Sequence, residues 1–413
     1  MQAISSLLEN RYHRVAKFLI LAICLFCVFS CFAEAQDVLC DQGVGGFHGE
    51  FHSTGIEVTV GASRNGELAI RRCEAALAWG KDNIVVAASA WQIDIDTLGA
   101  DLGLGAPVVA FQVKESDNDC CRGYKIYSLT KPPRLLRSLS GGSSFNAADK
   151  DLDGRVEIWT DDAAGIEGFD GLSLAELDAA PTIVLRFSHG RLMDVSSEFQ
   201  PEFDHHILEI QKELRPDDLQ DFHNSDGKLA SARSQPAERL HNLRRTKARI
   251  LEIVWAYLYS GREEQAWRSL AEMWPTNDAA RVREAIVSAR AHGISAQHAA
   301  ASSEPSPKRK KRVTIFDAVM RSEHGKPEVV PPEPILLLRP PGTQASGEES
   351  DKLETMVDLV VDSAGKVRSA EAAGKAQVDP ALIHAASGWK FIPAYKDGRS
   401  VACRTRISVS PKQ

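Results

Sequence analysis

The chain has 413 residues, of which 43% are hydrophobic and 25% are charged, and its formal net charge is −7. This composition is ordinary for globular protein and excludes a wholly disordered chain, and the 29 Gly and 19 Pro follow no collagen-like period. The acidic balance argues against nucleic acid as a main partner, because a phosphate backbone attracts cationic surfaces. At roughly 100–200 residues per domain, the length predicts two to four domains.

The N-terminus has the order of features of a secretory signal peptide. Arg11, Arg14 and Lys17 precede an apolar run over residues 18–32, and a small-x-small site ends at Ala35. The run is shorter than the roughly 20 apolar residues of a spanning helix. We therefore expect residues 1–35 to be removed and the mature protein to be periplasmic.

Two alternatives for this segment stay open, and they are the only routes by which we expect contact with a membrane. The residues before Cys31 loosely resemble a lipobox, so lipidation of Cys31 would give a membrane-anchored lipoprotein. Otherwise the apolar run is retained as a short anchor.

Sequencing the N-terminus of the exported protein tests the cleavage. We expect the mature chain to start at Gln36 and to be released with the soluble periplasm, because Ala33 and Ala35 flank Glu34 as a cleavage site requires. An intact N-terminus in the inner-membrane fraction would contradict cleavage, and a lipid-bearing Cys31 would select the second alternative.

Removal of the signal peptide leaves an odd number of cysteines, namely Cys40, Cys73, Cys120, Cys121 and Cys403. In an exported protein these residues are able to form disulfides, with at least one thiol left free or paired between chains. The neighbours Cys120 and Cys121 are not expected to bond to each other, because adjacent cysteines strain the bond geometry. The connectivity stays open, as does a set of buried unpaired thiols.

The mature chain changes character along its length, and we predict a multi-domain fold. Residues 36–200 form a mainly-β domain, because short apolar runs such as 107–113, 124–129 and 182–187 alternate with turn-forming clusters. Residues 201–300 have apolar residues at helical spacing and form an α-helical region. Residues 301–349 form a linker rich in Pro and charge, with a basic run at 308–312. Residues 350–413 form a small α+β domain.

Within the helical region, residues 250–275 predict two helices joined near Gly261. Ala266 gives a small residue on the second helix, and Pro275 follows its end. The segment resembles a single tetratricopeptide-like hairpin, which implies a role in protein binding. The alternative is an ordinary pair of helices, since one repeat is too few for a solenoid.

The segment 149–157 has carboxylates at alternate positions of a tight loop. Asp149, Asp151 and Asp153 precede Gly154, Arg155 could offer its backbone oxygen, and Glu157 closes the set. Calcium prefers six to eight oxygen ligands, so these residues predict a structural Ca²⁺ site. The pattern resembles the calcium loop of FG-GAP or integrin-type propeller repeats, in which the loop leads into a strand. The alternative is an acidic turn without an ion.

The C-terminal segment has its own succession of elements. A strand over 353–361 is followed by a turn at Gly365 and a second strand, and Asp379 and Pro380 begin a short helix. The helix leads to a W-x-F-x-P segment and a turn before the last strand. The residues that carry this pattern are Gly365, Asp379, Trp389, Phe391, Pro393 and Gly398.

This pattern resembles the TonB C-terminal domain. The resemblance implies a helix packed on a three-stranded antiparallel sheet, with Trp389 and Phe391 locking the helix end to the sheet. It also implies that the domain contacts envelope proteins, notably the plug segments of outer-membrane transporters. Departures from the family's energy-transducing members are the short N-terminal run and the reduced Pro-rich spacer, which put force transduction in doubt.

The sequence therefore predicts an exported bacterial envelope protein that acts as a protein-binding adaptor rather than as an enzyme. No nucleophile elbow, Walker loop, zinc-protease or dinucleotide motif occurs. The alternatives are a TonB-type energy-transducing component of outer-membrane transport and an exported enzyme acting through the β domain.

Overall fold

The computed structural model describes residues 39–63, 71–117, 120–229, 236–294, 296, 313–318, 329–338, 355–374 and 378–409. Val38–Gln413 form one compact unit. The predicted signal peptide, Cys31 and the basic run 308–312 lie outside the described residues. None of the helices in the described part of the chain has the length and apolar character needed to span a membrane.

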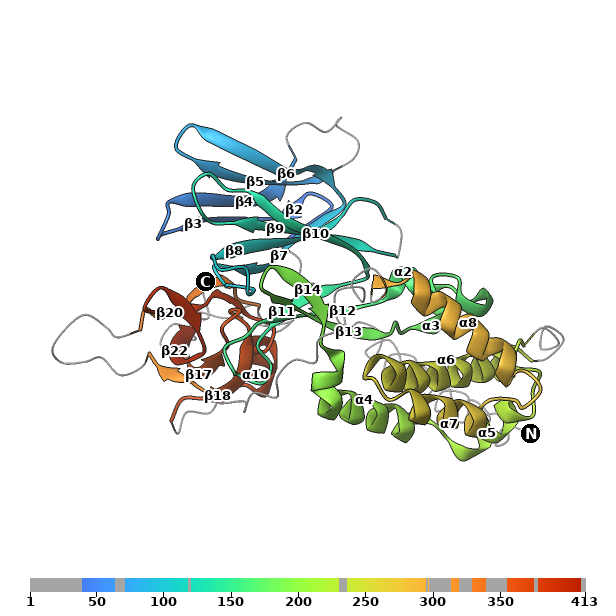
Figure 1. Ribbon diagram of the computed structural model, residues 1–413. Helices are drawn as coiled ribbons and strands as arrows, with labels where there is room; N and C mark the ends of the chain where they lie inside the picture. The colour runs from blue at the N-terminus through green and yellow to red at the C-terminus, as the bar shows by residue number, and fades with distance from the viewer. Residues whose placement is uncertain are drawn as a thin grey trace, which may run out of the picture. The chain divides into compact units, whose positions relative to one another are not determined.

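The N-terminal region consists of three sheets, each built around strands that pair in chain order (Figure 1). The first sheet has the order β3-β4-β5-β6, the second β10-β9-β8-β7-β1-β2 and the third β11-β12-β13-β14. All of their pairings are antiparallel. The strands are β1 (Cys40–Asp41), β2 (Val44–Gly45), β3 (Phe47–Phe51), β4 (Ile56–Ala62), β5 (Cys73–Trp79), β6 (Asp82–Ala90), β7 (Gln92–Leu98), β8 (Val108–Lys114), β9 (Arg122–Ser128), β10 (Leu135–Gly142), β11 (Phe145–Ala148), β12 (Glu157–Asp161), β13 (Thr182–Ser188) and β14 (Arg191–Asp194).

Alternation of side chains explains why these segments form strands. In β4, Ile56, Val58 and Val60 are buried while the residues between them are exposed, so one face of the first sheet packs on the core. In contrast, β8 is buried on both faces over most of its length. This central strand therefore has a continuous apolar sequence, which is the run predicted at 107–113.

Disulfides in the N-terminal region correct one expectation. Cys40 and Cys73 are bonded, with their Cα atoms 6.0 Å apart, and they link the second sheet to the first. Cys120 and Cys121 are bonded to each other, contrary to the prediction. Cys121 has a φ of 77°, a turn conformation that brings neighbouring side chains together. Among the described cysteines, Cys403 alone is outside a disulfide, and it is buried.

The central region is helical and shares a core with the third sheet. Short helical turns precede β13, and longer helices follow β14; the turns were not predicted because each is only three or four residues long. The helices are α2 (Ala163–Ile166), η1 (Phe169–Gly171), α3 (Leu174–Leu177), η2 (Ser196–Phe199), α4 (Gln200–Glu213), α5 (Pro216–His223), α6 (Ala237–Tyr259), α7 (Glu263–Met273) and α8 (Ala279–His292). One apolar cluster runs from strand residues such as Ile158 to helix residues such as Trp255 and Ile286.

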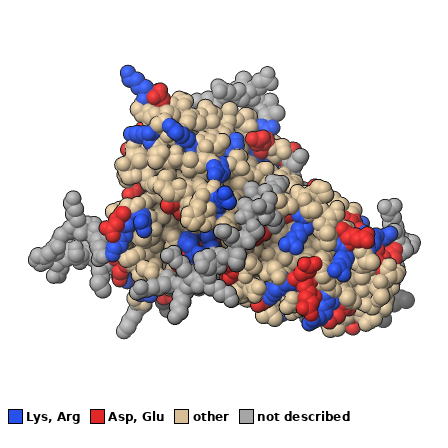
Figure 2. Space-filling view, in the orientation of Figure 1, with Lys and Arg blue, Asp and Glu red and all other residues tan. Residues whose placement is uncertain are grey.

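The predicted pair of helices at 250–275 is present as the end of α6 and α7. Gly261 has a φ of 78° in the turn between them, and Ala266 is fully buried. Figure 2 shows acidic and basic side chains close together over the helices. Among the ion pairs of the helices is Arg239–Asp221. The tetratricopeptide resemblance of this pair stays a prediction.

The C-terminal region contains the predicted strands and helix. Its main sheet has the order β15-β22-β17-β18, in which β22, β17 and β18 pair antiparallel and β15 adds parallel to β22. Two further pairs are β16 with β19 and β20 with β21. The elements are β15 (Phe316–Asp317), β16 (Glu333–Leu336), β17 (Thr355–Val361), β18 (Val367–Ala372), α10 (Pro380–Ala386), β19 (Lys390–Ile392), β20 (Ala394–Lys396), β21 (Arg399–Val401) and β22 (Cys403–Val409).

The residues of the C-terminal motif have the structural roles expected of them. The Asp379 side chain accepts a hydrogen bond from the Ala381 N–H and caps α10. Trp389 and Phe391 are buried in one cluster with Ala386 of α10 and Leu359 of β17, so they hold the helix end on the sheet. The order predicted for the whole chain is thus confirmed at the level of a β-rich region, central helices and C-terminal sheets.

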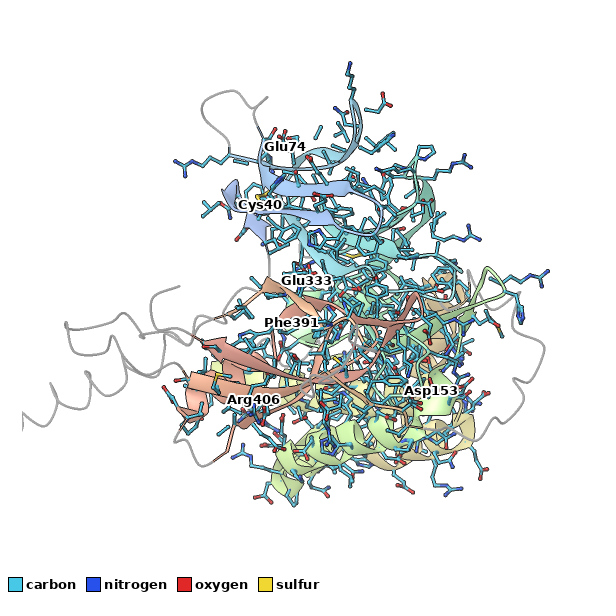
Figure 3. The ribbon with its side chains drawn as sticks, turned by 90° about the vertical axis from the view of Figure 1, so that its left-hand side faces the viewer. Cys40, Glu74, Asp153, Glu333, Phe391 and Arg406 are labelled. Atoms are coloured by element: carbon cyan, nitrogen blue, oxygen red, sulfur yellow. A yellow bond between two sulfur atoms is a disulfide. The ribbon has the colours of Figure 1, made fainter. Side chains whose placement is uncertain are left out.

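The predicted linker 301–349 contributes strands to the C-terminal region. In its described parts, β15 pairs with β22 and β16 pairs with β19. Glu333 lies opposite Ile392 and Pro334 opposite Phe391, and Figure 3 shows Glu333 and Phe391 close together. Pro334 and the apolar residues that follow it at 335–338 are compatible with a short edge strand, where a missing N–H is tolerated.

Gly365 is the position at which the C-terminal turn depends on glycine. Its φ is 84°, and a Cβ there would lie 1.8 Å from the Phe391 carbonyl oxygen. The Phe391 N–H also donates to the Gly365 carbonyl at 2.9 Å, so the two backbones are held against each other. No side chain fits between them.

We expect Gly365→Ala to lower the free energy of unfolding by about 3 kcal/mol or more. The left-handed conformation costs roughly 1–2 kcal/mol, and forcing an atom into a packed contact adds roughly 1–3 kcal/mol. Gly398→Ala is the matched control, because its φ is 77° and a Cβ there meets no atom within 4 Å. Denaturant unfolding measures both, and equal losses would contradict the role assigned to the contact with Phe391.

Candidate metal centre

The acidic loop, residues 149–157, joins β11 to β12 of the third sheet. One carboxylate oxygen from each of Asp149, Asp151 and Asp153 lies within 4.8 Å of the others, so these side chains could hold a metal ion. Asp149 is fully buried and the other two are half-buried. The structure therefore brings together three of the predicted ligands.

Hydrogen bonds within the loop fix its shape. Asp149 accepts the N–H groups of Asp153 at 3.0 Å and Gly154 at 2.9 Å. Gly154 has a φ of 84°, which allows the chain to turn back toward Asp149 without strain. The turn therefore folds around the first carboxylate, and the carboxylates at alternate positions converge.

Glu157 lies beside this group, at the start of β12. Its side chain is fully buried, and its Oε1 accepts a hydrogen bond from Arg186 Nε at 2.8 Å. Its Oε2 has no hydrogen-bond partner among the described residues. Burial is the main cause that raises the pKa of Glu157 to about 8, and the charges of Asp151 and Asp149 raise it further. A buried carboxylate oxygen near acidic neighbours favours a bound cation.

Arg155 contacts the candidate ligand Asp153 through its side chain and its N–H group. Its side chain donates to Asp153 Oδ2, with Nε at 2.8 Å, and its N–H donates to Asp153 Oδ1 at 2.9 Å. Arg155 therefore orients one candidate ligand. The use of its carbonyl oxygen as a ligand stays a prediction.

The C-terminal domain, residues 355–409, reaches into the acidic loop, and sequence reasoning missed this. The Asp149 N–H donates to Asp362 Oδ2 at 3.1 Å, and Ser363 Oγ donates to Asp149 Oδ2 at 2.9 Å. Asp362 and Ser363 are both fully buried. They were identified only as part of a turn, because no local pattern indicates a contact between residues more than 200 positions apart.

Charge around the loop is unbalanced in the way that a divalent cation would correct. Three guanidinium groups pair with the carboxylates, one each on Asp153, Glu157 and Asp362. With all the carboxyls ionised, the acidic groups exceed these basic groups by two negative charges; the acidic set is Asp149, Asp151, Asp153, Glu157 and Asp362, and the basic set is Arg155, Arg186 and Arg368. Two further charged side chains lie near this set: Glu198 pairs with Arg186, and Lys150 feels the charge of Glu157.

Asp149 has a raised pKa, chiefly because it is buried. Burial raises the pKa of Asp149 to about 7; the Ser363 hydroxyl opposes the shift, and the nearby charge of Asp362 adds to it. A cation bound between the carboxylates would supply the missing charge and favour their ionised forms. The donor set, all oxygen and mostly carboxylate, fits a hard divalent cation.

A polar cavity of about 570 Å³ lies beside the loop. Its charged lining includes Asp101, Arg155 and Arg186. Asp101 Oδ1 accepts the N–H groups of residues 103–105, and the two arginines pair with Asp153 and Glu157 as described above. These three side chains are engaged in structural contacts, and Asp397 and Arg399 complete the charged lining.

Comparisons with known proteins add no assignment. Searches with protein-family models, among curated proteins and among solved structures find no match for this chain. The resemblances to the TonB C-terminal domain and to propeller-type calcium loops therefore stay predictions.

We expect divalent cation to raise the melting temperature of the protein and Asp151→Ala to remove this effect. A ligand that binds only the folded state stabilises it by about 2.7 kcal/mol at 100 times its Kd. Asp82→Ala is the matched control, since Asp82 is an exposed aspartate on β6, away from the acidic loop. Scanning calorimetry with chelator and with added cation measures the shift. An unchanged melting temperature of the wild-type protein would show that the loop holds no ion.

Proposed function

We propose that this protein is an exported bacterial envelope protein that acts by binding other proteins through its C-terminal domain. The motif from Gly365 to Gly398, with its resemblance to the TonB C-terminal domain, gives the kind of partner: an envelope protein such as an outer-membrane transporter. Export and residence in the periplasm rest on the signal-like segment 1–35.

The open edge of the C-terminal sheet is the observation that carries the proposal. Among the described strands, β18 pairs with β17 alone and is therefore the last strand of its sheet. At the opposite edge of the same sheet, β15 pairs with Cys403 and Arg404 at the start of β22. An open edge presents unpaired N–H and C=O groups to which an extended segment of a partner adds as a further strand.

The domain that presents this edge has its own apolar core. Buried residues of β17 and β18 form a separate apolar cluster with Trp389, Phe391 and α10. A rigid edge lowers the entropy that a partner strand loses on pairing, because the receiving strand is already ordered. This arrangement suits binding better than chemistry.

Calcium is the ion that we propose for the acidic loop, in a structural role. Calcium accepts six to eight oxygen ligands in flexible geometry, whereas magnesium requires a near-ideal octahedron and keeps several waters. A loop with several carboxylates and the buried Glu157 Oε2 nearby supplies many oxygens in a confined space. In the melting-temperature titration, calcium is therefore expected to act at lower concentration than magnesium.

Two proline substitutions in β18 test the strand-pairing surface. Successive N–H groups of a strand point to opposite sides, so of Ser369→Pro and Ala370→Pro only one interrupts pairing with β17. The other removes an N–H from the open edge. We expect that variant to keep a melting temperature near that of the wild type and to bind a plug-segment peptide from an outer-membrane transporter at least about tenfold more weakly.

Ser369→Ala is the control, because it keeps the N–H of this exposed position. Fluorescence anisotropy with a labelled peptide and the full mature chain gives the affinity. If the wild-type protein binds no such peptide, or if both folded proline variants bind it as the wild type does, this strand is not the binding surface.

A further inference from the structure

The C-terminal domain and the acidic loop are joined by hydrogen bonds at Asp149. We propose that Asp362 and Ser363 are positioning residues of the metal site, so that metal binding holds the C-terminal domain against the N-terminal sheets and loss of the metal releases it. This inference rests on the proposed metal in the acidic loop and adds how that site is controlled.

Asp149 is the residue through which the two are joined. Its backbone N–H donates to Asp362 and its carboxylate accepts from Ser363, while the same carboxylate also accepts from Gly154 within the loop. The position of Asp149 is therefore fixed both by the acidic loop and by the C-terminal domain. If the C-terminal domain moves away, Asp149 loses one of the two hydrogen bonds that orient Oδ2, and the first candidate ligand is held less firmly.

Further contacts near Asp149 attach the C-terminal domain to β7 and to the acidic loop. Thr97 Oγ1 of β7 donates to the Ala364 carbonyl at 2.8 Å, and Lys366 Nζ lies 2.6 Å from Asp96 Oδ1. On the loop itself, the Thr314 N–H donates to the Leu152 carbonyl at 3.2 Å, just before β15. The C-terminal domain and the strand added to it thus reach the acidic loop at two points.

Charge makes the attachment sensitive to the metal. Docking places the fully buried carboxylate of Asp362 next to Asp149, and Arg368 pairs with Asp362 at 2.8 Å. Without a cation, Asp362 adds to the repulsion among the carboxylates of the acidic loop, and Arg368 opposes this repulsion. With a divalent cation in the loop, the same approach is favourable, because unlike charges attract strongly where water is excluded.

Linkage gives the expected size of the effect. Removing a group that orients a metal ligand typically weakens metal binding about 10–100-fold. Because coupling between two equilibria is reciprocal, the metal strengthens docking of the C-terminal domain by the same factor by which docking strengthens metal binding.

Calcium titration calorimetry on the full mature chain tests the first direction. We expect Ser363→Ala to weaken calcium binding about tenfold or more, because Asp149 loses the hydroxyl that orients it. Ser369→Ala is the control, because Ser369 is exposed on β18 of the same domain and should leave the affinity unchanged.

Hydrogen exchange tests the reverse direction without altering the C-terminal domain. In the wild-type protein, calcium should slow amide exchange in residues 362–366 and in β19, and Asp151→Ala should abolish this effect. If calcium binds, but Ser363→Ala binds it with wild-type affinity and calcium leaves the exchange of these residues unchanged, the linkage is wrong and the metal site stands. If the wild-type protein does not bind calcium in the calorimeter, both the site and the linkage fail.

Discussion

A pair of buried hydrogen bonds at Asp149 holds the distant parts of this protein together. The residue follows the last residue of β11, begins the acidic loop and meets Asp362 and Ser363 of the C-terminal domain. Because a buried polar group without a partner costs free energy, each of these residues requires the other. This contact therefore holds the C-terminal turn against the acidic loop.

Buried ion pairs next to this contact determine how the domains meet. Lys390 Nζ lies 2.5 Å from Asp94 Oδ2, and Lys366 pairs with Asp96, which also accepts a hydrogen bond from Tyr124. Asp94 and Asp96 both come from β7, and each pairs with a lysine of the C-terminal domain. Buried pairs contribute little net stability, but an orphaned buried charge costs about 3–5 kcal/mol. They therefore select one docking position and penalise shifted ones.

Local pattern predicted much of the fold and little of its assembly. The alternating residues of β17, the cap at Asp379 and the carboxylates of the acidic loop are local signals, and the structure places them as expected. The contact of Ser363 with Asp149 has no local signal, since a buried serine in a turn resembles any other serine in a turn. The bond between Cys120 and Cys121 was missed because it depends on the backbone conformation at Cys121.

The pairing of β15 and β16 determines where the C-terminal domain can be separated from the rest. Composition places the boundary near residue 350, but strands from 313–318 and 329–338 cover the edges of β22 and β19. A fragment that begins at residue 350 would expose both edges, and uncovered edges promote association between chains. A portion that keeps both strand pairs begins near residue 313, so residues 329–338 belong to the folded domain.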